Sequence, residues 1–423
     1  MNPRDLPSQG IHIMNADNQD WVAQLLPRAK ALTPELNTVG NYIDTHKALP
    51  KEILDAMFEA KLFRMLLPKS QGGAELDLPT FFKVILALAE GDASAAWTVA
   101  QSNGCAMSAA YMQEDAAQEM FGDVKSVLSW GFPAGPCKAT AVEGGWMVTG
   151  TWGFGSGSRH STWVGGHCHM FDANGVQQKN ADGSPLERTM LFPRDEVTIV
   201  DNQWNVIGLR GTGSDTYAVK DKFVATKYSV VPRAVGKDLQ KAEDAVVVED
   251  AERRVKSPLF HFSPTMIYQA GFAAVALGVA RAMLNSFIDL ASGKNAAGGA
   301  MLLRDNAVIQ ERVAVAHARL ASMTSWLSQS IQESWDGCVA NGKHGFDDRV
   351  TMRLASTYAI REATKVAQDV YTDAGATAIF AIHPFERRFR DIHAVAQQVQ
   401  SNPQHLQTAG QYYLGLKPNT RFI

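Results

Sequence analysis

The spacing of apolar residues divides the chain into three regions. In the first, residues 1–124, apolar residues recur every three to four positions, which is the period of a helix that buries one face. The stretch "ALPKEILDAMFEAKLFRML" places Ile53, Met57 and Leu62 near one stripe, with Pro50 at the first turn. The stretch "LPTFFKVILALAEGDASAAWTVA" predicts a strongly apolar pair of helices, and the Pro- and Gly-containing "LLPKSQGGAELDLP" predicts the loop before them. We therefore expect an N-terminal helical domain.

The period shortens in the second region, residues 125–235. The stretch "KATAVEGGWMVTGTWGF" contains two β-prone runs on either side of Glu143, Gly144 and Gly145, which is a hairpin signal. The stretches "TMLFPRDEVTIV" and "TYAVKDKFVATKYSV" continue with short β-prone runs. This region is expected to be a central β domain.

The helical period returns in the third region, residues 236–423. Its first 18 residues are polar and are expected to form an exposed excursion. Four later segments predict long amphipathic helices and hence an antiparallel bundle: "MIYQAGFAAVALGVARAMLNSFIDLAS", "RDNAVIQERVAVAHARLASMTSWLSQSIQESWD", "DRVTMRLASTYAIREATKVAQDVYTDAG" and "PFERRFRDIHAVAQQV". The first of these is the most apolar run of the chain. Because it carries Gln269 and Arg281, it predicts a buried helix rather than a membrane span. The whole pattern predicts an α+β chain.

Composition excludes several classes of function. The chain has 423 residues, too many for one small core, with 20% charged residues and a net charge of -3. This balance argues against a nucleic acid or an acidic membrane as the main partner. Residues 1–20 are polar and lack the apolar core of a signal peptide, so a cytoplasmic location is expected. His167 and His169 flank Cys168 and would share one face of a strand, but no third ligand stands nearby, so we expect no metal site.

The chemistry-bearing motifs are glycine- and hydroxyl-rich stretches of the β domain. The chain has no GxGxxG fingerprint, P-loop or GxSxG elbow. What remains is "WGFPAG" at 130–135, "WGFGSGSRH" at 152–160 and "GLRGTGSDT" at 208–216. Glycine lets the backbone approach a flat ligand, and Ser and Thr hydroxyls offer adjustable donors and acceptors. Such a wall suits a planar heteroaromatic ring, although a turn-rich β sandwich would carry similar glycines.

In this order, and together with "LLPKSQGGAELDL", "GDASAAW" and "DAGATAIF…HPFERRFRD", these stretches resemble the acyl-CoA dehydrogenase superfamily over most of the chain. The resemblance implies an N-terminal helical domain, a central β barrel and a C-terminal four-helix bundle. It also implies a flavin bound between barrel and bundle, usually in a homotetramer.

Two sequence features bear on the branch of this superfamily. Many dehydrogenases of the family carry a glutamate base a fixed distance after an "RD" pair; counted from Arg390 and Asp391, that position is Val399, flanked by glutamines. The stretches "WGFGSGSRH" and "GLRGTGS" instead resemble the two-component (group D) flavin-dependent monooxygenases. That branch implies reduced flavin, FADH2 or FMNH2, delivered by a separate NAD(P)H-dependent flavin reductase. With O2 the flavin gives a C4a-hydroperoxide, which oxygenates a small aromatic or heteroatom substrate.

Two alternatives stay open at the sequence level. One is an acyl-CoA dehydrogenase or related flavin oxidase with its base at a non-standard position. The other is a non-catalytic binding protein on this fold.

The resemblance also implies roles for individual residues. Ser156 is expected to stabilise the oxygenated flavin near its N5 atom, with Ser158 as the second candidate. His160 would orient the substrate or cap the end of the strand, and Trp97 is expected to pack in the core. The residues implied in cofactor binding are Trp130, Phe132, Pro133, Phe154, Ser156, Arg210, Ser214 and Arg387.

Several of these residues have structural alternatives. Trp130 and Phe132 could be core aromatics at strand ends, and Arg210 and Ser214 could shape a turn. Arg387 could meet a flavin phosphate across subunits, because a guanidinium matches phosphate bidentately, or could belong to an ion-pair set at a helix N-terminus.

The position expected for a phenol-deprotonating base carries no base. Phenol-hydroxylating relatives often have a histidine at the position that matches Gln397 or Gln398, and an imidazole about where Cys105 falls. His393 is close in sequence to Gln398 but in a different register. A glutamine cannot accept a phenolic proton, so we expect a substrate that needs no such deprotonation, for example an indole, an amine or a sulfur compound.

Overall fold

A computed structural model describes residues 21–418 apart from 182, 202, 232–253, 296–298 and 300. The expected polar excursion at 236–253 and the N-terminal segment 1–20 lie outside the described residues. The first region is helical, as the spacing predicts: α1 Leu25–His46, α2 Lys51–Glu59, α3 Leu78–Gly91, α4 Ala93–Ala106 and α5 Glu114–Phe121. Asp92 separates the predicted helix pair, because its side chain accepts a hydrogen bond from Ala95 N–H (3.0 Å) and caps α4.

The second region forms one eight-stranded sheet. Its strands are β1 Leu128–Pro133, β2 Lys138–Val142, β3 Gly145–Gly155, β4 Trp163–Phe171, β5 Glu187–Pro193, β6 Thr198–Val200, β7 Asp215–Ala225 and β8 Ser229–Val230. The order is β6-β7-β3-β1-β4-β5-β8, and β2 pairs with both β3 and β4. The predicted hairpin is confirmed, since Val142 faces Gly145 and Gly144 takes a φ of 75° in the turn. The strands form a barrel around one core, in which Trp152 and Tyr217 are fully buried.

The described residues of the third region form three long helices rather than four. α7 Pro264–Gly293, α8 Ala307–Asn341 and α9 Phe346–Ala374 are followed by a short α10, Phe385–Val395. The expectation of a fourth long helix through 399 is wrong. After Val395 the chain makes a 3-10 turn at Val399–Ser401 and restarts as α11, Gln404–Tyr413. Asn402 precedes Pro403 and has a ψ of 126°, the extended conformation that a following proline imposes, so no helix can run through this point.

The helical regions share one core. α7 is long and apolar enough to cross a membrane, but 78% of its most apolar stretch is buried inside the protein, which agrees with the predicted core helix. It approaches α4 and α3 through small residues: a Cβ at Gly271 would lie 3.0 Å from Ala100 Cβ, and one at Gly278 would lie 2.6 Å from Ala89 Cβ. The N-terminal helices and the bundle are therefore one packing unit.

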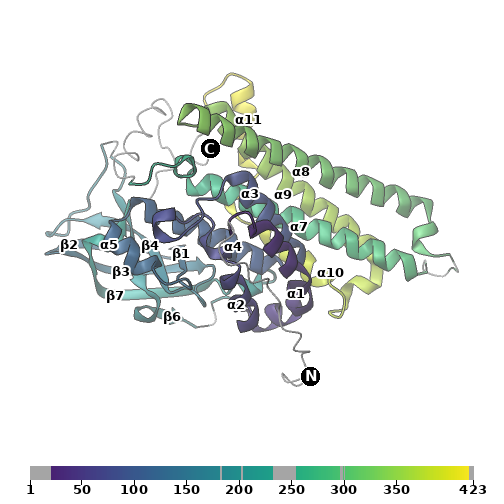
Figure 1. Cartoon of the computed structure of the whole chain (residues 1–423), viewed down its shortest axis with the longest axis horizontal. Coiled ribbons are helices and arrows are strands. Elements are labelled where there is room, and N and C mark those ends of the chain that lie inside the picture. The colour runs from purple at the N-terminus through teal and green to yellow at the C-terminus, as the bar shows by residue number, and fades with distance from the viewer. Residues whose placement is uncertain are drawn as a thin grey trace.

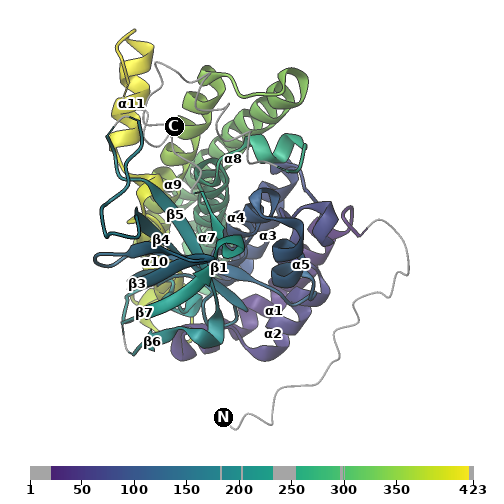
Figure 2. The ribbon, with the colours of Figure 1, turned by 90° about the vertical axis from the view of Figure 1, so that its left-hand side faces the viewer.

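The strands lie at one end of the molecule (Figure 1). The long helices α7, α8 and α9 extend to the other end, α1–α4 lie between, and α5 lies beside the strands. Seen from the strand end, α1, α2, α3 and α5 flank the strands on one side, while α11 lies on the other (Figure 2). In this arrangement the glycine-rich stretches of the β domain lie near the helical core.

Candidate functional site

All three glycine-rich stretches meet in the structure, with 152–160 between the other two. Phe132 of the first stretch pairs with Gly153, and hydrogen bonds join 152–160 to 208–216. Gly157 N–H donates to the Thr212 carbonyl (2.9 Å), and Ser158 Oγ donates to the Gly213 carbonyl (3.2 Å). Ser158 is fully buried, so its hydroxyl is committed to holding the two stretches together. A direct contact of Ser158 with a ligand is therefore not supported by the geometry.

Ser156 lies at the centre of a chain of hydroxyl groups. Its Oγ lies 2.7 Å from Ser214 Oγ, and Ser214 Oγ lies 2.7 Å from Thr212 Oγ1. On the other side, Trp97 Nε1 donates to Ser156 Oγ (3.0 Å). Trp97 packs in the buried core, as predicted, and in addition donates this hydrogen bond, which the sequence did not indicate. Sequence reasoning also missed Thr212, although its hydroxyl stands in the same "GTGS" motif as Ser214.

An exposed aromatic wall lies beside this chain of hydroxyls. Phe132 on β1 and Phe154 on β3 are 63% and 66% exposed, and Phe132 pairs in register with Gly153. Phe154 takes a φ of 59°, a left-handed conformation that is costly for an aromatic residue. A Cβ added at Gly153 would meet only Thr216 Oγ1, at 3.4 Å. Exposed aromatic rings with open space over a glycine fit the face of a flat ring such as a flavin.

The other residues of the strand wall are placed as follows. Pro133, next to Phe132, is exposed. Trp204 makes an edge contact with Phe154, with ring centroids 6.2 Å apart. Trp130 is partly buried and tilted against His167, with centroids 5.8 Å apart. The roles of Phe132, Pro133, Phe154 and Trp130 in flavin binding stay predictions.

His160 lies against the N-terminal helical region. Its ring is tilted against Phe63, with centroids 5.4 Å apart, and its Nε2 is buried with no hydrogen-bond partner in the described structure. Burial lowers the pKa of His160 to about 4, so the imidazole is neutral at neutral pH. The geometry favours a packing role, and a role in orienting the substrate stays untested.

Gln398 lies in the turn after α10. Its Oε1 accepts a hydrogen bond from Gln400 N–H (2.7 Å). Its Nε2 is buried and has no partner in the described part of the chain, so it is a donor available to a ligand. His393 packs on Phe389, with ring centroids 4.4 Å apart, and its Nε2 is likewise buried without a partner.

Arg387 is buried rather than open to a phosphate. It is 3% exposed, and its Nη1 lies 2.6 Å from Asp92 Oδ2 and 4.0 Å from Asp391 Oδ2. The structure therefore supports the ion-pair interpretation, with Asp92 of α4 as the main partner. A guanidinium held inside the protein cannot reach a phosphate bound at the surface.

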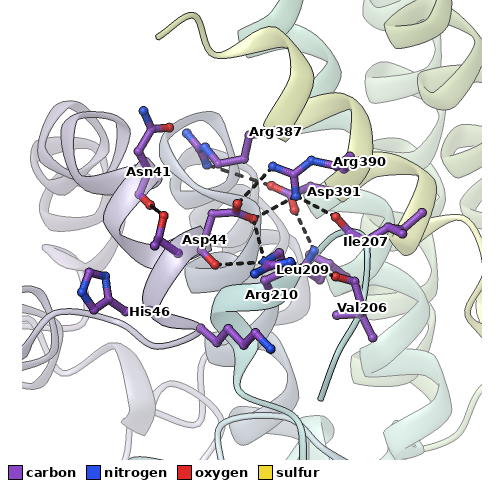
Figure 3. A network of polar contacts seen from close by, with 12 residues as sticks. Asn41, Asp44, His46, Val206, Ile207, Leu209, Arg210, Arg387, Arg390 and Asp391 are labelled. Atoms are coloured by element: carbon purple, nitrogen blue, oxygen red, sulfur yellow. Dashed lines mark hydrogen bonds and ion pairs between the residues drawn. The ribbon is translucent and has the colours of Figure 1, made fainter. Parts of the chain in front are cut away.

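A polar network fixes the loop that carries Ser214 (Figure 3). Leu209 N–H donates to Asp391 Oδ1 (2.7 Å), and Arg390 forms a bidentate pair with Asp44 (3.0 Å for each nitrogen). Arg210 also binds Asp44, donating from Nε to its carbonyl (3.1 Å). Desolvation raises the pKa of Asp391 to about 7. Arg210 is thus a loop anchor, and its contact with flavin stays a prediction.

A second buried cluster joins α4 to α7. Phe272 stacks between Trp97 and Tyr268, with centroids 3.7 and 5.5 Å apart and interplanar angles of 2° and 5°. The Tyr268 hydroxyl lies 3.5 Å from Gln101 Nε2 and 3.6 Å from Cys105 Sγ. Desolvation raises the pKa of the Cys105 thiol to about 12, so Cys105 cannot act as a base. The cluster offers aromatic surface and neutral polar groups.

The described residues contain no group of three or more His, Cys, Asp or Glu side chains that could hold a metal ion. His167 Nδ1 lies 2.7 Å from Thr189 Oγ1, while His169 Nε2 lies 3.3 Å from Glu187. The histidines around Cys168 thus have other partners.

The comparisons with known proteins define the family. The model of the acyl-CoA dehydrogenase N-terminal domain matches residues 29–123, and that of the C-terminal domain matches residues 270–403. Together they cover more than half of the chain. The protein belongs to the acyl-CoA dehydrogenase family.

Individual relatives indicate the class of enzyme within this family. The chain is 28% identical to an indole-3-acetate monooxygenase of Pseudomonas putida, over 89% of this chain and 90% of that protein. It is 25% identical to the flavin-dependent monooxygenase oxygenase subunit HsaA of Rhodococcus jostii (strain RHA1), over 90% of this chain and 95% of that protein. Among solved structures, XiaF from a Streptomyces species, in complex with FADH2 and glycerol, has the same fold, with a TM-score of 0.82 at 22% identity, covering 94% and 96% of the two chains.

Proposed function

We propose that this protein is the oxygenase component of a two-component flavin-dependent monooxygenase. The observation that carries the proposal is the wall of exposed aromatics on the strands, with linked hydroxyls in the turns beside them, in a chain whose curated relatives are named as flavin-dependent oxygenases. Bound reduced flavin would activate O2 for transfer of one oxygen atom to the substrate. Phe132 and Phe154 would hold the flavin ring, and Ser156 would contact its polar edge. The Trp97–Phe272 stack would exclude water.

The dehydrogenase alternative needs a free carboxylate base. The buried carboxylates of the described chain are Asp92, Asp215, Glu362 and Asp391. Each has a partner: Asp92 pairs with Arg387, Asp215 with Arg159 (2.8 Å), Glu362 with Lys365 (2.5 Å), and Asp391 accepts from Leu209 N–H. This pairing favours oxygenation over α,β-desaturation.

The substrate class follows from the neutral polar groups near the helical core. Gln398 offers an amide donor and Cys105 a neutral thiol, and neither accepts a phenolic proton at neutral pH. An electron-rich ring such as indole, an amine nitrogen or a sulfur atom needs no deprotonation before it attacks an electrophilic oxygen. The proposed substrate is therefore a small compound of this kind.

The test of this function is stopped-flow mixing of the purified protein with reduced flavin and oxygen. An oxygenase component is expected to purify almost colourless, to bind reduced flavin and to give a transient absorbance distinct from both oxidised and reduced flavin. A protein that purifies yellow and is reduced by an acyl-CoA would instead be a dehydrogenase. A protein without affinity for either form of flavin would be a binding protein on this fold.

The proposal extends to the partners and the location of the protein. An oxygenase subunit of this kind needs a separate NAD(P)H-dependent flavin reductase, which the naming of relatives as an oxygenase subunit and an oxygenase component supports. We also propose that the protein forms a homotetramer and is located in the cytoplasm. Size-exclusion chromatography with light scattering and copurification with a reductase would test these points.

A further inference from the structure

The hydroxyl chain around Ser156 has only one direction that satisfies every group. It begins at Trp97 Nε1–H, passes through Ser156, Ser214 and Thr212, and ends at the Leu209 carbonyl, which lies 2.8 Å from Thr212 Oγ1. An indole N–H can only donate and a carbonyl oxygen can only accept, so both ends of the chain are fixed.

The single proton of each hydroxyl is thereby assigned. Thr212 donates to the Leu209 carbonyl and so must accept from Ser214. Ser214 has then used its proton and must accept from Ser156. All three hydroxyl residues are at most 6% exposed, so water does not offer a ready substitute partner. The chain therefore runs from Trp97 to Leu209 and does not reverse without losing a hydrogen bond in the protein interior.

The end of the chain is held in place by the loop network. Leu209 takes a φ of 53°, an uncommon conformation for a residue with a branched side chain, and its N–H is bound by Asp391 Oδ1. A Cβ at Gly208 would lie 2.1 Å from the Arg390 carbonyl, so the loop lies directly on the backbone of α10. The acceptor at the end of the chain thus has a fixed position.

We infer that Ser214 and Thr212 are positioning residues that make Ser156 a hydrogen-bond acceptor toward the bound flavin. Ser156 donates its proton to Ser214 and accepts from Trp97, so one lone pair is all that its hydroxyl can offer a ligand. This inference rests on the proposed function. It adds the two residues, Ser214 and Thr212, through which the site would distinguish the two redox forms of the cofactor.

The discrimination follows from the chemistry of the flavin ring edge. The N5 atom of reduced flavin carries a proton and is a donor, whereas N5 of oxidised flavin carries none and is an acceptor. An acceptor-only Ser156 forms a hydrogen bond with the reduced form and opposes a lone pair in the oxidised form. The protein is expected to bind reduced flavin more tightly than oxidised flavin, as an oxygenase supplied with reduced flavin requires.

The experiment compares affinities in anaerobic titrations of the full-length protein. Oxidised and dithionite-reduced FMN and FAD are each titrated, and Kd is followed by quenching of tryptophan fluorescence. In Ser214→Ala the proton of Ser156 is released and can turn to the ligand. The ratio of the Kd for oxidised flavin to the Kd for reduced flavin is then expected to fall by about 3- to 10-fold.

Thr212→Val keeps the side-chain volume and is also expected to lower the ratio of the two Kd values, but it acts through Ser214. Without its acceptor, Ser214 can turn to donate to Ser156, which again frees the proton of Ser156. Thr212→Ser keeps the hydroxyl and is expected to keep the wild-type ratio. Ser158→Ala is the matched control, because Ser158 binds the same loop at Gly213 but stands outside the chain.

The outcomes are distinct. A ratio that falls in Ser214→Ala and Thr212→Val, and holds in Thr212→Ser and Ser158→Ala, supports the inference. If Ser214→Ala and Thr212→Val weaken the binding of oxidised and reduced flavin equally, Ser214 and Thr212 have only a structural role and the inference is overturned. Wild-type protein that binds oxidised flavin more tightly than reduced flavin would also overturn it. If the wild type binds neither form, the proposed function itself fails.

Discussion

Trp97 Nε1 donates a hydrogen bond of 3.0 Å to Ser156 Oγ and so joins helix α4 to the turn that follows strand β3. The two residues are 59 positions apart in the sequence, and both are almost fully buried. This bond connects the aromatic stack of the helical core to the hydroxyl chain in the turns of the β domain. The residue at the proposed flavin edge therefore has its orientation set by a different domain.

Removal of the Ser156 hydroxyl is expected to lower stability. In Ser156→Ala the buried indole N–H of Trp97 loses its acceptor, which costs about 1–3 kcal/mol of unfolding free energy. Chemical denaturation followed by tryptophan fluorescence measures this loss. Ser322→Ala, on the exposed surface of α8, is the control and should stay within about 0.5 kcal/mol of the wild type. Equal stabilities of Ser156→Ala and wild type would contradict the bond.

The ion pair between Asp92 and Arg387 is expected to be sensitive to loss of charge. Asp92→Asn keeps a good N-cap for α4 but leaves the Arg387 guanidinium buried without its 2.6 Å partner. The expected loss of unfolding free energy is about 3–5 kcal/mol. The exposed pair Arg319–Asp369 is the matched control, and Asp369→Asn should cost about 1 kcal/mol or less. A similar loss of unfolding free energy in the two variants would show that burial of the Asp92–Arg387 pair does not affect its contribution to stability.

His160 is expected to make the protein less stable in mild acid. Its pKa is about 4 in the folded protein against 6.5 for the free side chain, so the unfolded chain binds a proton first as the pH falls. Stability from the neutral imidazole is complete above pH 6.5 and is lost toward pH 4, at up to about 1.4 kcal/mol per pH unit. His160→Phe removes this contribution, so its unfolding free energy should fall less steeply than that of the wild type over this range. Parallel curves for the two proteins would mean that His160 titrates normally.

Gln398 is expected to set the preference for substrates that need no base. The wild type should oxygenate indole better than phenol, and Gln398→His should raise the rate on phenol, by up to about 100-fold for a well-placed general base. Gln397→His places the same group at an exposed neighbouring position and should change neither rate. Initial rates with reduced flavin supplied in excess provide the measurement. A wild type that oxidises phenol well and indole poorly would rule out the proposed substrate class.

Most of the fold is predictable from local sequence signals. The period of apolar residues predicts a helical first region, including α2, α3 and α4, and the helices α7–α9, and the glycines at 144 and 145 predict the β2–β3 hairpin. The prediction failed at the last helix of the bundle, because α10 ends at Val395 and Gln398, with a ψ of 163°, is extended and caps the following turn by accepting from Gln400 N–H. Local geometry there outweighs the hydrophobic pattern.

The sequence by itself determined the helical and strand regions, the family resemblance, and the hydroxyl groups of the "WGFGSGSRH" and "GLRGTGSDT" stretches. Only the tertiary structure decided how those groups are used. It commits Ser158 to a carbonyl, buries Arg387 against Asp92, and places Trp97 as the donor to Ser156. A residue type fixes what a side chain can donate or accept, but its partners come from segments far apart in the chain. The direction of the chain of hydroxyls around Ser156 is therefore a property of the folded protein.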